Sequence, residues 1–115
     1  MEDDRRVFAR MNVKFPLRYL DPSSGKEGKG ETTDICANGI GFVTKDKLSG
    51  RTPLEMWLEI PDRHAPLYTR GDVVWAEEPS VDDRQRIGVR LERAEFMGLG
   101  RAMWLKKRNA QAITA

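Results

Sequence analysis

The stretch ETTDICANGIGFVTKDKL, residues 31–48, decides the fold because it contains two short strand-like runs and the turn between them. The runs cover Thr32 to Cys36 and Ile40 to Thr44, and they are separated by Ala37, Asn38 and Gly39. A connection this short joins antiparallel strands, and Asn38 and Gly39 are suited to positive φ angles in a tight turn. The stretch is therefore predicted to form a β-hairpin.

Before this hairpin, another strand and a loop are predicted. Met11 to Asp21 alternates apolar and polar residues with a period of two, which is typical of a half-buried strand. Pro16 cannot donate a hydrogen bond to a sheet, so it is expected at an edge or a bulge. The polar, glycine-rich stretch PSSGKEGKG, residues 22–30, predicts an exposed hairpin loop.

After the hairpin, three strands and a helix are predicted. The strands are Leu54 to Ile60, Tyr68 to Glu77 and Gln85 to Glu92, and the helix covers residues 94–112. The helix is predicted from apolar residues and glycines at intervals of three and four, namely Phe96, Leu99, Gly100, Met103 and Trp104. Short strands at this spacing indicate an all-β fold, a six-stranded antiparallel barrel capped by the C-terminal helix.

The chain is accordingly expected to be one domain, with a leader over residues 1–10, a barrel over 11–93 and the helix after it. Trp57, Trp75 and Trp104 are expected to be core or capping aromatics rather than surfaces on which a ligand stacks. We expect His64 to be a surface loop residue and Cys36 to be a small buried group.

Composition argues against several functional classes. Cys36 is the only cysteine and His64 the only histidine, so no internal disulfide and no cysteine-based zinc cluster is possible. No nucleophile elbow or phosphate-binding glycine loop is present, so we expect no catalytic residue, metal or cofactor, and no enzyme. No stretch approaches the roughly 18 to 20 apolar residues that cross a bilayer, and no signal peptide is apparent, so a cytoplasmic protein without membrane insertion is expected.

Two polar segments carry the candidate chemistry. RRVFAR and DICANG contain the candidate residues Arg5, Arg6, Arg10, Asp34, Cys36, Asn38 and Gly39. Arginine has a planar fork of donors that matches phosphates and the O6 and N7 acceptors of guanine. A carboxylate can accept from the guanine N1 and N2 donors, and a glycine allows a close approach of the backbone. These residue types favour an anionic ligand, and they are compatible with a guanine nucleotide.

The same segments resemble the two motifs of the PilZ family, R-x-x-x-R with an extra arginine often ahead of it, and D/N-x-S-x-x-G. Arg6 and Arg10 match the arginine pair, Arg5 matches the extra arginine, and Asp34 and Gly39 match the ends of the second motif. The runs IGF, VVW and IGVRL also resemble PilZ strands. The chain departs from the pattern at Cys36, where the family usually has serine.

The resemblance implies a bacterial receptor for cyclic di-GMP (c-di-GMP) that acts in motility, surface polysaccharide or biofilm control. It implies that the seven candidate residues bind the ligand, that the ligand orders the leader, and that the partner-binding surface changes. It also implies a downstream protein partner, which is not identified, and two stacked ligand molecules. No DNA partner is expected.

Two other functions stay open at this stage. A PilZ scaffold that has lost ligand binding would serve as an adaptor, and the replacement of serine by Cys36 is the only feature that favours it. A small barrel that binds single-stranded nucleic acid would need exposed aromatic side chains along a basic groove. Taken alone, the arginines also fit a solvated terminus, and Asp34 and Asn38 also fit ordinary turn residues.

Overall fold

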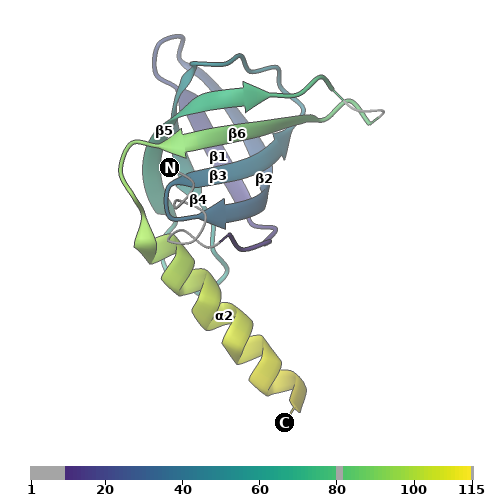
Figure 1. The fold of residues 1–115 in the computed structure, drawn as a ribbon, viewed down its shortest axis with the longest axis vertical. Helices are drawn as coiled ribbons and strands as arrows, with labels where there is room; N and C mark the ends of the chain where they lie inside the picture. Colours follow the sequence, from purple (N-terminus) through teal and green to yellow (C-terminus); the bar gives the residue numbers. More distant parts are fainter. Residues whose placement is uncertain (1–9, 80–81, 115) are drawn as a thin grey trace.

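The computed structural model describes residues 10–79 and 82–114, and it describes helix side chains as far as residue 109. In this part of the chain, six strands are followed by one helix (Figure 1). The elements are β1 (Pro16–Asp21), β2 (Lys26–Cys36), β3 (Gly39–Thr44), β4 (Pro53–Leu58), β5 (Leu67–Ala76), β6 (Gln85–Leu91) and α2 (Phe96–Thr114). No helix in the described ranges has the length and hydropathy required to span a bilayer.

The strands close into an antiparallel barrel in the order β1-β2-β3-β6-β5-β4. β1 pairs with both β2 and β4, so the sheet has no free edge. Alternate residues of each strand point inward, as in β4, where Leu54, Met56 and Leu58 are each at most 1% exposed. The predicted six-stranded barrel with a C-terminal helix is confirmed.

The loop predicted over residues 22–30 was wrong in extent, because β2 already begins at Lys26. Only four residues separate β1 from β2, and Gly25 has a φ of 77° in that turn. Gly28 and Gly30 belong to the strand, where a Cβ would lie 2.3 Å from the Tyr19 hydroxyl and 2.7 Å from the Phe42 ring, respectively. These two glycines leave space for core aromatic rings and do not end the strand.

The first predicted strand was also longer than the observed one. β1 begins at Pro16, and the residues before it contribute the isolated bridge between Met11 and Ile35 and hydrogen bonds with Thr32, among them that from the Thr32 N–H to the Phe15 carbonyl at 2.9 Å. Pro16 occupies neither an edge nor a bulge, because it is the first residue of a strand in a closed barrel. At the first position of a strand the missing N–H costs little.

The hairpin between β2 and β3 forms as predicted, with Cys36 opposite Gly39. The expected positive φ angles do not occur at Asn38 or Gly39; among the described residues, they occur at Gly25, Arg51, Arg63 and Asp83. Gly39 is instead constrained by space, because a Cβ there would lie 3.0 Å from the backbone oxygen of Val89.

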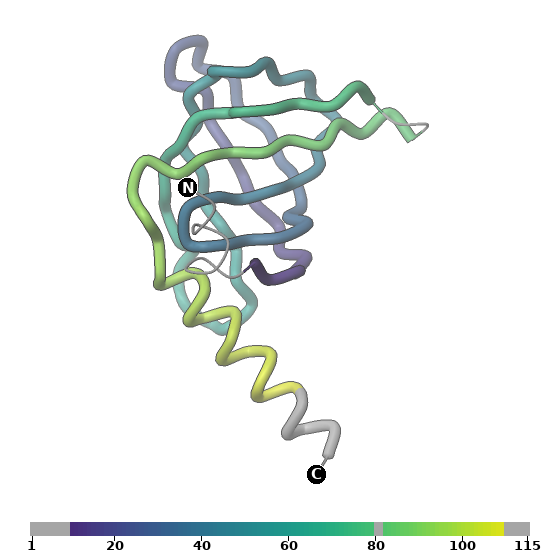
Figure 2. The backbone as a smooth tube through the Cα atoms, in the orientation of Figure 1, coloured from purple at the N-terminus to yellow at the C-terminus, as the bar shows by residue number. Residues whose placement is uncertain are grey.

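α2 packs on the barrel through its first turns and then runs away from it (Figure 1, Figure 2). The packing residues are Gly98 and Ala102, which are buried, and Leu99 and Leu105, which are partly buried against the core. Of the residues from which the helix was predicted, Phe96, Met103 and Trp104 are 50–61% exposed. The helix is present as predicted, and of the residues from which it was predicted Leu99 packs against the core.

Candidate functional site

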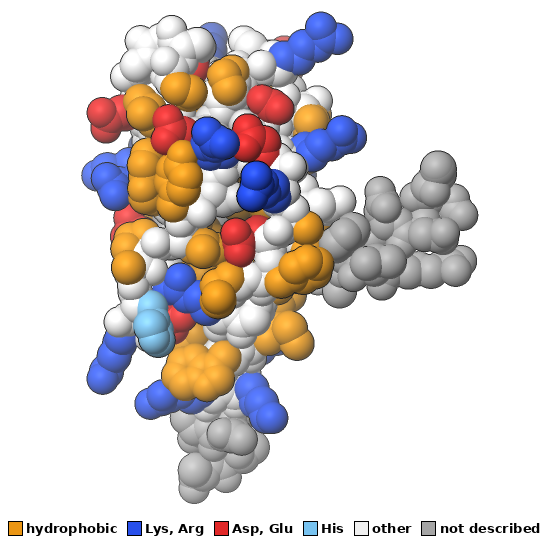
Figure 3. All heavy atoms as spheres, turned by 90° about the vertical axis from the view of Figure 1, so that its left-hand side faces the viewer, with side chains coloured by type: hydrophobic (Ala, Val, Ile, Leu, Met, Phe, Trp, Pro, Cys, Tyr) orange, Lys and Arg blue, Asp and Glu red, His pale blue; other side chains and the backbone are white. Residues whose placement is uncertain are grey.

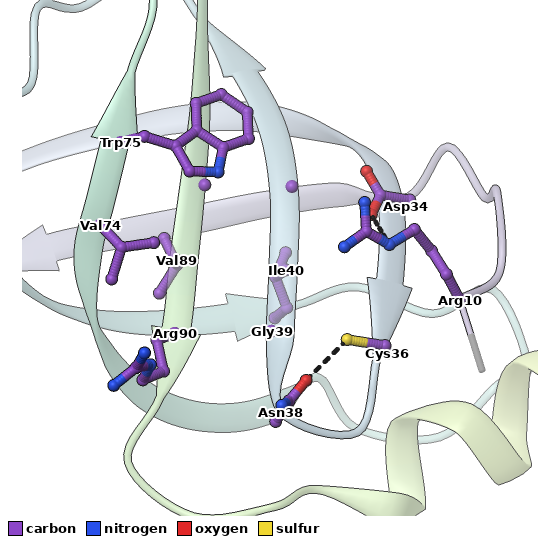
Figure 4. A pocket seen from close by; sticks show the side chains of 12 residues that line it. Arg10, Asp34, Cys36, Asn38, Gly39, Ile40, Val74, Trp75, Val89 and Arg90 are labelled. Carbon is purple, nitrogen blue, oxygen red and sulfur yellow. Dashed lines mark hydrogen bonds and ion pairs between the residues drawn. The ribbon is translucent and has the colours of Figure 1, made fainter. Parts of the chain in front are cut away.

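A hollow lies on the outer surface of four adjacent strands, β2, β3, β6 and β5 (Figure 4). It has a volume of about 190 Å³ and contains all the described candidate residues. Its lining consists of Arg10, Asp34, Cys36, Asn38, Gly39, Ile40, Gly41, Val74, Trp75, Gly88, Val89 and Arg90.

Glycines form much of the floor of this hollow. A Cβ on Gly41 would lie 2.5 Å from Asp34 Oδ1 and 2.9 Å from Thr33 Oγ1. A Cβ on Gly88 would lie 2.2 Å from the indole of Trp75. Because these positions carry no side chain, the side chains of Asp34, Thr33 and Trp75 can lie close to the backbone.

The edge formed by β2 carries an acidic group paired with an arginine. A register shift between Thr32 and Asp34 interrupts the pairing of β2 with β3, and such bulges redirect side chains. Thr33 Oγ1 donates a hydrogen bond to Asp34 Oδ1 at 2.8 Å, and Arg10 Nε lies 3.2 Å from Asp34 Oδ2. The Asp34 side chain is 18% exposed, whereas that of Arg10 is 69% exposed. The guanidinium is thus oriented by Asp34 and still accessible to a ligand.

Cys36 and Asn38 lie at the turn between β2 and β3. The Cys36 thiol donates a hydrogen bond to Asn38 Oδ1 at 2.9 Å (Figure 4). Cys36 is half-buried rather than fully buried, so the expectation of a buried group was too strong. A thiol is a weaker hydrogen-bond donor than the hydroxyl that the family motif usually supplies.

Trp75 forms the wall opposite Arg10 and Asp34 (Figure 4). The pairing of β5 with β6 shifts between Val73 and Trp75, and both Val74 and Trp75 are exposed, at 52% and 44%. The expectation that Trp75 is a core or capping residue was therefore wrong, as it was for Trp104 at 50% exposure. Alternation along β5 did not predict this wall, because the shift changes the side from which Trp75 projects.

Four further residues need to be placed relative to the hollow: the candidates Arg5 and Arg6, and also Arg90 and His64, which were not candidates. Arg5 and Arg6 lie outside the described residues, so their part in the site stays a prediction. Arg90 lines the hollow and is exposed, and it was not among the candidates. His64 lies outside the hollow and is exposed, as predicted; its N–H donates to Asp62 Oδ1 at 3.1 Å.

The turn between β2 and β3, which lies at the edge of the hollow, is hydrogen-bonded to the end of β6 and to the segment that leads into α2. The N–H of Leu91 donates to the carbonyl of Asn38 at 2.9 Å, and the N–H of Glu95 donates to the carbonyl of Ala37 at 2.6 Å. Ala37 is fully buried. The turn that carries Cys36 and Asn38 thus contacts the residues just before the helix.

The site is therefore a shallow polar hollow on the outside of a closed six-stranded barrel, with an arginine–aspartate pair facing an exposed indole. The family model for the PilZ domain matches residues 4–97. The chain belongs to the PilZ family.

Solved structures with the same fold include PilZ domain proteins. The PilZ domain of YcgR from Escherichia coli with c-di-GMP has a TM-score of 0.70 at 11% identity, with 96% of this chain and 97% of that chain covered. The PilZ domain of CeSA from a cellulose synthesizing bacterium has a TM-score of 0.58 at 17% identity, with 84% and 92% covered.

The Bacillus subtilis inhibitor of motility MotI/DgrA has a TM-score of 0.67 at 15% identity. The match covers 93% of this chain and 52% of MotI/DgrA, so this chain spans about half the length of that protein. No curated protein matches the sequence.

Proposed function

We propose that this PilZ domain is a receptor for c-di-GMP and that the ligand binds in the hollow on β2, β3, β6 and β5. The observation that carries the proposal is the convergence of the described members of both predicted motifs, Arg10 from the first and Asp34 to Gly39 from the second, on that hollow. Two neighbours with the same fold are described as complexes with c-di-GMP, the YcgR domain and MrkH of K. pneumonia.

The chemistry of the hollow suits a guanine nucleotide. Arg10 can donate two parallel hydrogen bonds to guanine O6 and N7 or pair with a phosphate, and Asp34 can accept from N1 and N2. Trp75 lies on the opposite side and is 44% exposed, and a base can stack on an exposed aromatic ring. Gly41 and Gly88 allow the Asp34 carboxylate and the Trp75 indole, which form the two walls, to lie close to the strands.

Part of the proposal concerns the leader. Arg10 lies at the edge of the hollow, so Arg5 and Arg6 are five and four residues from a group already in the site. We propose that c-di-GMP draws both arginines onto the same face and that two stacked ligand molecules fill it. Slower amide exchange of residues 1–10 on addition of ligand is the expected result, and exchange unaffected by ligand would contradict the ordering.

The proposed output is a change of a partner-binding surface. Its support is the pair of hydrogen bonds from Leu91 and Glu95 to Asn38 and Ala37. A ligand that shifts this turn also moves the segment before α2, so α2 is the element whose position, and therefore whose exposed surface, would change. The motility role in the name of MotI/DgrA makes motility control one proposed setting for this output.

Calorimetric titration with c-di-GMP tests the proposal, with Gly41→Ala and Gly50→Ala as matched variants. The added methyl at Gly41 would displace the Asp34 carboxylate, whereas a Cβ at Gly50 meets nothing within 4 Å. We expect saturable binding with two ligands per chain, weakened by Gly41→Ala and unchanged by Gly50→Ala. No heat with the parent protein would contradict the receptor and favour an adaptor. Binding that both variants retain would place the ligand elsewhere.

A further inference from the structure

The outer side of α2 carries large apolar side chains that the barrel does not cover. Met97, Met103 and Trp104 are 61%, 59% and 50% exposed, and Phe96 at the start of the helix is 61% exposed. Figure 3 shows hydrophobic side chains, in orange, over the helix near the single histidine, in pale blue, with basic side chains, in blue, beside them. Contiguous exposed apolar groups of this kind mark interaction surfaces, whereas isolated ones do not.

This outer face of α2, defined by Met97, Gly100, Met103 and Trp104, is hollowed at Gly100. A Cβ at Gly100 would meet nothing within 4 Å, and a hollow of about 620 Å³ opens there between the side chains of Phe96, Met97 and Trp104. A hollow of this size admits a large apolar side chain. Methionine walls can adapt to the shape of what enters, because the side chain is unbranched and flexible.

The floor of the hollow is a fixed ion pair. Arg101 Nε lies 2.6 Å from Asp62 Oδ2, and a second guanidinium nitrogen of Arg101 lies 2.6 Å from Asp62 Oδ1. The same nitrogen donates to the carbonyl of Ala65 at 3.0 Å. The Asp62 and Arg101 side chains are 3% and 15% exposed. This bidentate pair holds the loop between β4 and β5 against the helix, so the hollow is preformed.

The charge of the helix selects the partner. The helix sequence FMGLGRAMWLKKRNAQAIT contains no acidic residue, and beyond the paired Arg101 it has Lys106, Lys107 and Arg108. These three are exposed next to the apolar side chains, and the Arg108 guanidinium lies 5.1 Å from the centre of the Trp104 ring. A second α2 carries the same positive charge and would be repelled.

We propose that the outer face of α2 is the docking surface for an acidic amphipathic helix of another protein. One apolar side chain of that helix enters the hollow at Gly100, and its acidic residues pair with the basic cluster at residues 106–108. A concave hollow is filled by a protruding side chain and not by a flat bilayer, which favours a protein over a lipid surface. The proposal names the partner surface for the output described above and rests on that function only for its regulation by ligand.

The test uses three synthetic helical peptides with the same apolar residues: one with Glu at every polar position, one with Lys, and a scrambled Glu peptide. Binding is measured by the anisotropy of labelled peptide for parent, Gly100→Leu, Trp104→Ala and the control Tyr68→Ala. Tyr68 is also an exposed aromatic, at 44%, but it lies on β5 against Trp57. The Cβ of a leucine at Gly100 would meet no atom within 4 Å, so the side chain can project into the hollow and compete with an incoming side chain.

We expect the Glu peptide to bind at least about tenfold more tightly than the other two, and more weakly as salt is added. Gly100→Leu and Trp104→Ala should each weaken it by about tenfold or more, and Tyr68→Ala should not. Equal binding of all three peptides, or no loss in the two α2 variants, would overturn the proposal.

Two further measurements distinguish other occupants. Sedimentation of the protein alone, and with vesicles of phosphatidylcholine and phosphatidylglycerol, should show no self-association and no vesicle binding that Gly100→Leu abolishes. Self-association that Gly100→Leu abolishes would overturn the proposal in favour of a second copy of the chain. Vesicle binding that Gly100→Leu abolishes would overturn it in favour of a membrane. The Gly100→Leu variant should bind c-di-GMP like the parent, so a failure of docking is distinguishable from a failure of the receptor function.

Discussion

Replacement of Trp75 by alanine removes one wall of the proposed ligand site, and its effect on binding can be separated from its effect on stability. The side chain is 44% exposed, so about half of its surface is covered by the protein. A buried tryptophan covers about 150 to 250 Å², so about 100 Å² of contact is lost here, worth about 2.5 kcal/mol of unfolding free energy at about 25 cal/mol per Å².

Trp104→Ala is the matched control, because Trp104 is 50% exposed and loses a similar contact area on α2, and it does not line the proposed c-di-GMP site. Stacking of a base on an aromatic ring contributes about 1 to 3 kcal/mol, which corresponds to about 5- to 150-fold in affinity. We therefore expect similar losses of unfolding free energy in the two variants, but weaker c-di-GMP binding only in Trp75→Ala.

The assay is calorimetric titration with c-di-GMP at a temperature at which circular dichroism shows both variants folded. The reasoning would be refuted if Trp75→Ala bound with the affinity of the parent. It would also be refuted if both variants weakened binding equally, since the loss would then reflect general destabilisation rather than stacking.

Three further changes give distinct outcomes. Arg10→Ala should weaken c-di-GMP binding by about 1.5 to 3 kcal/mol. It should change the free energy of unfolding by less than about 1 kcal/mol, because the exposed ion pair of Arg10 with Asp34 contributes little to folding. Calorimetric titration and urea unfolding measure the two quantities, and an affinity equal to that of the parent would exclude Arg10 from the site. Cys36→Ser should tighten c-di-GMP binding by about 0.5 to 1.5 kcal/mol if the hydroxyl regains one hydrogen bond, whereas Cys36→Ala should bind with the affinity of the parent. Equal affinity of the parent and both variants in the titration would mean that Cys36 only packs. The ion pair with Arg101 lowers the pKa of Asp62 below its ordinary 3.8, so the stability that the pair supplies is complete above that pH and is lost as the pH falls below it. Urea unfolding from neutral pH to about pH 2.5 should show that the difference in free energy of unfolding between the parent and Asp62→Asn becomes smaller. A difference that stays constant over this range would contradict the role of the pair.

The barrel could be predicted from sequence wherever one face of a strand is apolar. β4 follows strict alternation, and the prediction for it was confirmed, whereas the first half of β2 carries Gly28 and Gly30. In the sequence, those glycines are typical of a loop, but in the structure they leave space for the side chains of Tyr19 and Phe42 from other strands. A clash that involves distant residues leaves no local pattern, so the beginning of β2 could not be predicted.

The site divides in the same way. Arg10 and Asp34 belong to short motifs that are visible in the sequence, and the structure brings them within 3.2 Å of each other; their part in binding stays a prediction. Trp75 was missed because its exposure follows from a register shift in β5 and from the absence of a side chain at Gly88. The interval pattern predicted the helix but not the face that meets the barrel, because glycine and alanine at 98 and 102 pack closely while larger residues such as Met103 remain outside.

The most direct test of the central claim is a titration of ¹⁵N-labelled protein with c-di-GMP, followed by two-dimensional NMR. Binding in the hollow predicts the largest changes of amide shift at residues 34–41, 74–75 and 88–90, together with the indole N–H of Trp75. The amides of β1 and β4, which do not line the hollow, should change least. Shifts concentrated on β1 and β4, or no shifts at saturating ligand, would contradict the claim.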